Sequence, residues 1–108
     1  MSKFTLADLE KRVHARAKAS AEQSYTRTLL DQGVAHCAKK LGEEAIETAI
    51  AAVQQDKARL IAEAADLIYH LMVVLEARGV SLAQVEAELG KRTRQSGHQE
   101  KASRKRKA

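Results

Sequence analysis

The sequence predicts an all-α protein of one domain, and its length and composition lead to this prediction. The chain has 108 residues, the size of a single small domain. It contains no proline and only five glycines, and the strong helix formers Ala, Leu, Glu, Lys, Arg and Gln dominate it. Aromatic residues are scarce, since Phe4, Tyr25 and Tyr69 are the whole set. A core rich in Ala and Leu but poor in rings favours close helix packing over a β-sandwich.

The first helix is expected from about residue 6 to residue 18. Thr5 is a suitable N-cap residue, and Asp8 stands three positions later, as in a capping box. Apolar residues recur at helical spacing along this segment and define one face: Leu6, Leu9 and Val13. The segment is therefore predicted to pack as an amphipathic helix.

A connection and two further helices should follow. Segment 19–26 is polar with a weak pattern, so we interpret it as a connection, and a short helix over 27–32 should end at Gly33. The next helix is expected over about 34–54. Its apolar residues do not form a single stripe, because Lys and Glu side chains lie between two apolar sides.

The helix expected over about 57–77 is the most apolar segment of the chain. Asp56 should cap it, and Gly79 should mark its end. Apolar residues lie almost all round this helix, and such a helix is buried on most sides. One chain of this size has too few other helices to cover it, so the sequence predicts a partner subunit, most simply in a two-fold homodimer.

Ser81 and Gln84 form a capping box at the start of a last helix, which should extend to about residue 92. The predicted fold therefore has four to five helices. We divide the chain into a helical domain over residues 1–93 and a basic, flexible tail over 94–108.

Charge is unevenly distributed along the chain. Residues 91–108 hold eight Lys or Arg against the single acid Glu100, whereas residues 1–90 hold eleven basic against thirteen acidic residues. The folded part is thus mildly acidic, which disfavours a nucleic-acid-binding domain, because such a domain normally carries a basic folded surface. Cys37 is the only cysteine, so no intrachain disulfide can form. No apolar run is long enough for a signal peptide or a membrane span, and we expect a cytoplasmic protein.

Two acidic pairs are the candidate functional centre. Glu44 and Glu47 lie three residues apart on one expected helix, and Glu63 and Asp66 have the same spacing on the next. Residues at this spacing share a helix face. Because the connection near residues 54–57 is tight, the two helices should be antiparallel neighbours. Both pairs lie about seven residues from that turn, so at ~1.5 Å per residue they should be level.

The chemistry of these four carboxylates points to a bound cation. Glu63 and Asp66 interrupt the most apolar helix, and burying an unpaired carboxylate costs several kcal/mol. Oxygen ligands without His or Cys favour Mg²⁺ or Mn²⁺ over zinc. Such a metal suits a substrate with phosphate groups, with water attacking phosphorus. The alternative is that these acids are solvent-facing helix residues in i,i+4 salt bridges.

At this point the sequence resembles a known group of enzymes. Glu44-x-x-Glu47, then fifteen residues, then Glu63-x-x-Asp66 is similar to the signature of the all-α nucleoside-triphosphate pyrophosphohydrolases, the MazG-like group. Further segments narrow the resemblance to the phosphoribosyl-ATP pyrophosphohydrolases: Ser24-Tyr25-Thr26, KKLGEEA at 39–45, EAADLIYH at 63–70 and EKASR at 100–104. The resemblance covers about residues 4–104.

The resemblance implies a reaction, a cofactor and an assembly. It implies hydrolysis of phosphoribosyl-ATP to phosphoribosyl-AMP and pyrophosphate in histidine biosynthesis, by metal-activated attack of water on the triphosphate. It also implies dependence on magnesium, a cytoplasmic location, and a homodimer with helices from both subunits around each site. The metal ligands that it implies are Glu44, Glu47, Glu63 and Asp66.

The candidates for catalytic groups are Glu43, Glu47 and Lys40. Glu43 is either a second-metal ligand or base, or a solvated partner of Lys39 or Lys40. Lys40 lies one turn before Glu44, so it either contacts a phosphate oxygen or pairs with Glu44.

The candidates for substrate binding are Tyr25, Lys39, Lys40, His70, Lys101 and Arg104. Tyr25 either hydrogen-bonds ribose or phosphate, or anchors its loop. His70 either orients Asp66 or contacts substrate, or is an ordinary core residue. The cations of 97–104 either fold over the polyphosphate or belong to a disordered terminus.

Two rival functions remain open at this stage. A related enzyme that removes ordinary or damaged nucleoside triphosphates would use the same metal site. A helical nucleic-acid-binding protein would instead use the basic tail, and salt-dependent DNA binding would be its sign.

Overall fold

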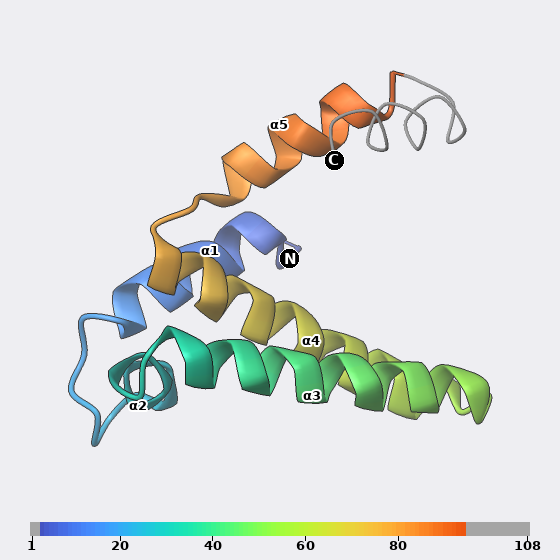
Figure 1. The fold of residues 1–108 in the computed structure, drawn as a ribbon, viewed down its shortest axis with the longest axis horizontal. Coiled ribbons are helices and arrows are strands. Elements are labelled where there is room, and N and C mark those ends of the chain that lie inside the picture. The colour runs from blue at the N-terminus through green and yellow to red at the C-terminus, as the bar shows by residue number, and fades with distance from the viewer. Residues whose placement is uncertain (1–2, 95–108) are drawn as a thin grey trace.

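The computed structural model describes residues 3–94, and over this range the chain is all-α, as predicted. The five helices are α1 (Leu6–Arg16), α2 (Tyr25–Asp31), α3 (Val34–Val53), α4 (Lys57–Arg78) and α5 (Leu82–Arg92). In Figure 1, α3 and α4 form a long antiparallel pair, α1 crosses α4, and α2 lies at the end of the pair. Helix α5 points away from the other helices.

The predicted caps explain where three helices begin. The hydroxyl of Thr5 accepts from the backbone N–H of Asp8, and the Asp8 carboxylate accepts in return from Thr5, so this capping box is confirmed. Ser81 and Gln84 form the second capping box at the start of α5. Asp56 caps α4 through the N–H of Arg59.

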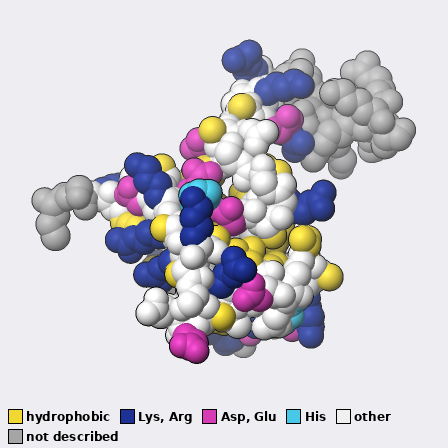
Figure 2. Space-filling model, turned by 90° about the vertical axis from the view of Figure 1, so that its left-hand side faces the viewer, with side chains coloured by type: hydrophobic (Ala, Val, Ile, Leu, Met, Phe, Trp, Pro, Cys, Tyr) yellow, Lys and Arg dark blue, Asp and Glu magenta, His cyan; other side chains and the backbone are white. Residues whose placement is uncertain are grey.

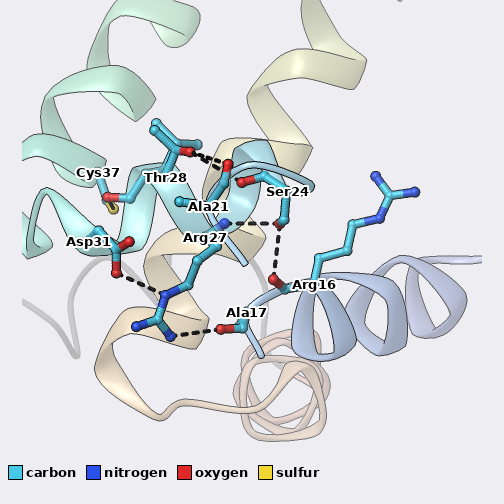
Figure 3. A network of polar contacts seen from close by, with 9 residues as sticks. Arg16, Ala17, Ala21, Ser24, Arg27, Thr28, Asp31 and Cys37 are labelled. Atoms are coloured by element: carbon cyan, nitrogen blue, oxygen red, sulfur yellow. Dashed lines mark hydrogen bonds and ion pairs between the residues drawn. The ribbon is translucent and has the colours of Figure 1, made fainter. Parts of the chain in front are cut away.

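The segment before α2 corrects the prediction. Helix α1 ends at Arg16 instead of residue 18, and α2 begins at Tyr25 instead of residue 27. Ser24 causes the earlier start, because its hydroxyl accepts from the N–H of Arg27 at 3.1 Å and donates to the carbonyl of Arg16 at 2.9 Å. Figure 3 shows this network. Tyr25 therefore lies in the first turn of a helix, and its position in a loop was wrong.

The Arg27 side chain closes the same corner of the molecule. Its guanidinium donates to the carbonyl of Ala17 at 2.9 Å and pairs with Asp31 at 2.8 Å (Figure 3). The other ends of the long helices differ from prediction by one residue: α3 ends at Val53 and α4 at Arg78. Gly79 follows α4 with φ +68°, a left-handed conformation that glycine adopts without steric cost.

The core of the described protomer is small and lies where α1, α2, α3, α4 and the start of α5 meet. Its buried members are Val13, Leu29, Cys37, Met72, Val73 and Leu82. The start of α5 is attached to α1, since the Glu10 carboxylate accepts from the N–H of Leu82 at 2.7 Å. Beyond this point α5 makes no extensive contact with α3 or α4 in the described range.

A large apolar surface remains exposed on α3 and α4. Ile46 is 63% exposed, Val53 81% and Ile61 71%. Within residues 3–94 of one protomer α4 is thus not buried on most sides, and burial of its apolar surface needs contacts from outside this range. No helix in residues 3–94 has the length and hydropathy required to span a bilayer.

Candidate metal and substrate site

The packing of α3 against α4 brings the predicted acids together. One carboxylate oxygen each from Glu44, Glu63 and Asp66 lies within 4.8 Å of the others. Glu44 comes from α3, whereas Glu63 and Asp66 come from α4, so the cluster spans the two helices. Glu47, one turn further along α3, lies close enough to raise the pKa of both Glu44 and Glu63.

The electrostatics of the cluster disfavour four free carboxylates. Burial raises the pKa of Glu44, and the neighbouring carboxylates, Glu47 first, raise it further. The pKa of Glu63 is raised by burial, then by Glu47 and Asp66, and Arg59 opposes the shift. The cluster therefore needs protons or a cation to neutralise it.

Two orphaned oxygens show that the residues present fit a cation. Oε2 of Glu44 and Oε2 of Glu63 are buried and have no hydrogen-bond partner within residues 3–94. A buried polar atom without a partner is costly, and a metal ion can replace the missing hydrogen bonds. The donor set consists of carboxylate oxygens alone, which suits Mg²⁺ or Mn²⁺.

Lys40 lies beside the acids and pairs with Glu43. Its Nζ lies 3.4 Å from Glu43 Oε1, and this interaction is the largest cause that raises the pKa of Lys40. The structure thus places Lys40 with Glu43, three residues on, instead of with Glu44. Lys39 is exposed on the same helix.

Three rings form a group next to the acids. The rings of Tyr25 and Tyr69 are stacked with their centroids 6.4 Å apart, and the His70 ring meets Tyr69 edge-on at 5.1 Å. Tyr25 also meets His70 edge-on at 6.4 Å. Thr26 Oγ1 lies 2.6 Å from the hydroxyl oxygen of Tyr69, and this hydrogen bond joins α2 to α4. Tyr25, which begins α2, is held against the rings by this contact.

His70 is buried, but it is not an ordinary satisfied core residue. The residue is only 6% exposed, and the Nδ1 atom of its ring has no hydrogen-bond partner in the described range. Burial lowers the pKa of His70, and Lys40 lowers it further, which favours the neutral imidazole. A neutral imidazole keeps one nitrogen free to accept a hydrogen bond from a ligand.

Sequence reasoning missed Thr48, Tyr69 and the role of Thr26 as a bridge. The signal for Thr48 was a single polar residue on the face of α3 that carries Ala45, Ala49 and Ala52, one turn after Glu44. The bridge between Thr26 and Tyr69 spans 43 residues of sequence, and no local pattern reveals it. Lys101 and Arg104 lie outside the described residues.

Magnesium should stabilise the protein more at pH 7.5 than at pH 5. The raised pKa values of Glu44 and Glu63 mean that the folded, metal-free state binds more protons than the unfolded state, so its stability falls as pH rises through those values. A metal binds the deprotonated carboxylates and removes this penalty. We expect excess Mg²⁺ to raise the melting temperature by about 5–10 °C at pH 7.5 and by less than half of that at pH 5.

Thermal unfolding in Mg²⁺ and in EDTA, at both pH values and at matched ionic strength, measures this difference. Equal shifts at pH 5 and pH 7.5 would show that the ion acts elsewhere on the protein.

Comparison with known proteins agrees with this geometry. Residues 6–93 match the model of the family described as phosphoribosyl-ATP pyrophosphohydrolase. The chain is 65% identical over 104 residues to a phosphoribosyl-ATP pyrophosphatase of Azorhizobium caulinodans, covering 96% of this chain and 95% of that protein. It is 63% identical over 105 residues to phosphoribosyl-ATP pyrophosphatase 1 of Bradyrhizobium diazoefficiens, covering 97% and 99%. A phosphoribosyl-ATP pyrophosphatase of Rhizobium meliloti is 56% identical over 104 residues, covering 96% and 97%.

Proposed function

This chain belongs to the phosphoribosyl-ATP pyrophosphohydrolase family, and from that premise we propose that it hydrolyses phosphoribosyl-ATP to phosphoribosyl-AMP and pyrophosphate in histidine biosynthesis. The observation that carries the proposal beyond the family is the cluster of Glu44, Glu63 and Asp66, with its buried, unpartnered oxygens. A cluster of this kind suits the charge of a triphosphate only when a cation lies between the two.

We assign the metal to Glu44, Glu47, Glu63 and Asp66. Mg²⁺, or Mn²⁺ in its place, would shield the phosphate charge and activate water when bound. The family membership and the oxygen-only donor set support this assignment. The carboxylates would hold the ion, and their neutralisation by it would lower the cost of packing four acids between α3 and α4.

The remaining polar groups would bind and orient the substrate. Glu43 or Glu47 would accept the proton of the attacking water, and the bond between the α- and β-phosphates would break. Lys40 would leave Glu43 and contact a phosphate oxygen, with Lys39 nearby on the same helix. Its partly exposed pair with Glu43, three residues away on the same helix, is weak enough to exchange for a phosphate.

Tyr25 would hydrogen-bond the ribose or a phosphate from α2, and His70 would contact the substrate or orient Asp66 from α4. The unpartnered Nδ1 of His70 and the exposed Tyr25 ring support these roles. Lys101 and Arg104, outside the described residues, are proposed to contact the phosphates.

The functional unit that we propose is a cytoplasmic homodimer. The exposed apolar residues of α3 and α4, among them Ile46, Val53 and Ile61, support it, because a second copy would bury them. Helices of both subunits would then surround each site.

The deciding experiment follows pyrophosphate release from phosphoribosyl-ATP in Mg²⁺, with dCTP and dUTP as competing substrates. We expect rapid release from phosphoribosyl-ATP and at most slow release from the deoxynucleotides. Faster release from dCTP or dUTP would favour a general nucleoside-triphosphate pyrophosphohydrolase. No release from phosphoribosyl-ATP would refute the proposal.

One face of the described residues offers little support for a nucleic-acid-binding role. On the face seen in Figure 2, Lys and Arg side chains are interspersed with Asp and Glu side chains. A duplex-binding face would instead carry a continuous basic patch.

A further inference from the structure

Thr48 makes an unusual contact between the two helices of the site. Its hydroxyl oxygen lies 2.7 Å from the carbonyl oxygen of Glu44 on α3 and 3.1 Å from the carbonyl oxygen of Glu63 on α4. The first contact is the ordinary bond of a helical threonine to the residue one turn back. The second crosses to the neighbouring helix, so a single hydroxyl hydrogen is shared between two carbonyls.

The two carbonyls belong to Glu44 and Glu63, the first acidic residues of the cluster on α3 and on α4. Glu44 and Glu63 also carry the two buried oxygens without partners. Thr48 thus touches the backbone of both residues that carry these oxygens, next to carboxylates that repel one another. A hydroxyl that donates to both backbones opposes this repulsion without adding charge to the cluster.

We propose that Thr48 is a positioning residue for the metal site: its hydroxyl ties α3 at Glu44 to α4 at Glu63 and so holds their carboxylates close enough together to bind a cation. This inference rests on the proposed function for the presence of the metal. It concerns the protein backbone, because the Thr48 hydroxyl contacts the carbonyl oxygens of Glu44 and Glu63. Loss of a group that orients metal ligands typically weakens metal binding by about 10–100-fold.

The test compares three variants in a substrate-free measurement. Thr48→Val keeps the shape of the side chain but removes the hydroxyl, and Thr48→Ser restores it. Thr28→Val is the matched control, because the Thr28 hydroxyl also lies 3.2 Å from two carbonyl oxygens, those of Ala21 and Ser24, in a part of the chain without the four acids. Mn²⁺ binding is followed by electron paramagnetic resonance, and the Mg²⁺ dependence of pyrophosphate release is measured in parallel.

We expect Thr48→Val to raise the Mn²⁺ dissociation constant by about tenfold or more. The Mg²⁺ concentration for half-maximal rate should rise by the same factor, while kcat at saturating Mg²⁺ changes by less than about threefold, because the ligands themselves are intact. Thr48→Ser and Thr28→Val should bind Mn²⁺ within about twofold of the unmodified protein. Thr48→Ala, which also lacks the hydroxyl and favours helix, serves if valine impairs folding.

The inference is overturned if Thr48→Val binds Mn²⁺ normally, if Thr28→Val weakens binding as much, or if Thr48→Ser fails to restore it. These outcomes differ from failure of the proposed function. A protein that releases no pyrophosphate from phosphoribosyl-ATP but whose Mn²⁺ affinity depends on the Thr48 hydroxyl would refute the substrate and leave the positioning role standing.

Discussion

Replacing Glu63 with glutamine should lower the rate of pyrophosphate release by about 10³-fold, because the metal supplies several kcal/mol of transition-state stabilisation and each 1.36 kcal/mol is about tenfold in rate. The same change should raise the melting temperature of the metal-free protein. Burial and the neighbouring carboxylates raise the pKa of Glu63, so its charged form is disfavoured in the fold, and a neutral amide of equal size relieves the repulsion. Activity and metal-free stability should therefore change in opposite directions.

The combination of lower activity and higher metal-free stability distinguishes a metal ligand from an acid that only stabilises the fold. Glu86→Gln, on the exposed surface of α5, is the control and should leave both quantities nearly unchanged. Steady-state rates at saturating Mg²⁺ and thermal unfolding in EDTA provide the two measurements. Near-normal turnover of Glu63→Gln would remove Glu63 from the metal site.

Introducing a charge at Ile46 should convert the proposed dimer into monomers. The Ile46 side chain is 63% exposed in the protomer, so glutamate at this position leaves the protomer fold largely intact. In a dimer the same carboxylate would be buried in an apolar interface, at a cost of several kcal/mol on each side. We expect Ile46→Glu to weaken dimerisation by at least about 10³-fold and to lower activity at low protein concentration.

Analytical ultracentrifugation over a range of concentrations measures the dimerisation, and circular dichroism checks the helix content. Leu6→Glu, at an exposed apolar position on α1, is a control for the added charge. If Ile46→Glu sediments like the unmodified protein, the interface lies on another surface or the chain acts as a monomer.

Local patterns in the sequence were sufficient to predict most of the fold. Helix caps are hydrogen bonds between residues close in sequence, so they can be predicted from local patterns. Thr5, Asp56 and Ser81 cap the starts of their helices as their side chains and spacing indicate. The acidic pairs were predictable for a similar reason. Their equal distance from a tight turn fixes which residues of two antiparallel helices meet, and Glu44, Glu63 and Asp66 do meet.

The features that could not be predicted depend on contacts distant in sequence or on a choice between equal neighbours. Ser24 starts α2 early because it also bonds the carbonyl of Arg16, which folding brings close. Lys40 had two acids within reach, Glu43 and Glu44, and only the rotamer in the folded protein places it beside Glu43. The roles of the site residues remain predictions, because they concern a bound substrate and not the protein alone.

The buried position of Cys37 allows its reactivity to report local opening of the protein. Cys37, on α3, is the only thiol of the chain and is 1% exposed. Its Sγ donates to the carbonyl of Leu29, so α2 packs against it. Burial raises the pKa of this thiol and slows its reaction further. A thiol reagent can modify it only while the packing around it, which includes its contact with Leu29 of α2, is open. The labelling rate therefore measures how often this packing, which includes the helix that carries Tyr25, opens. A change in that rate on adding a nucleotide would report how strongly the bound nucleotide stabilises the closed packing.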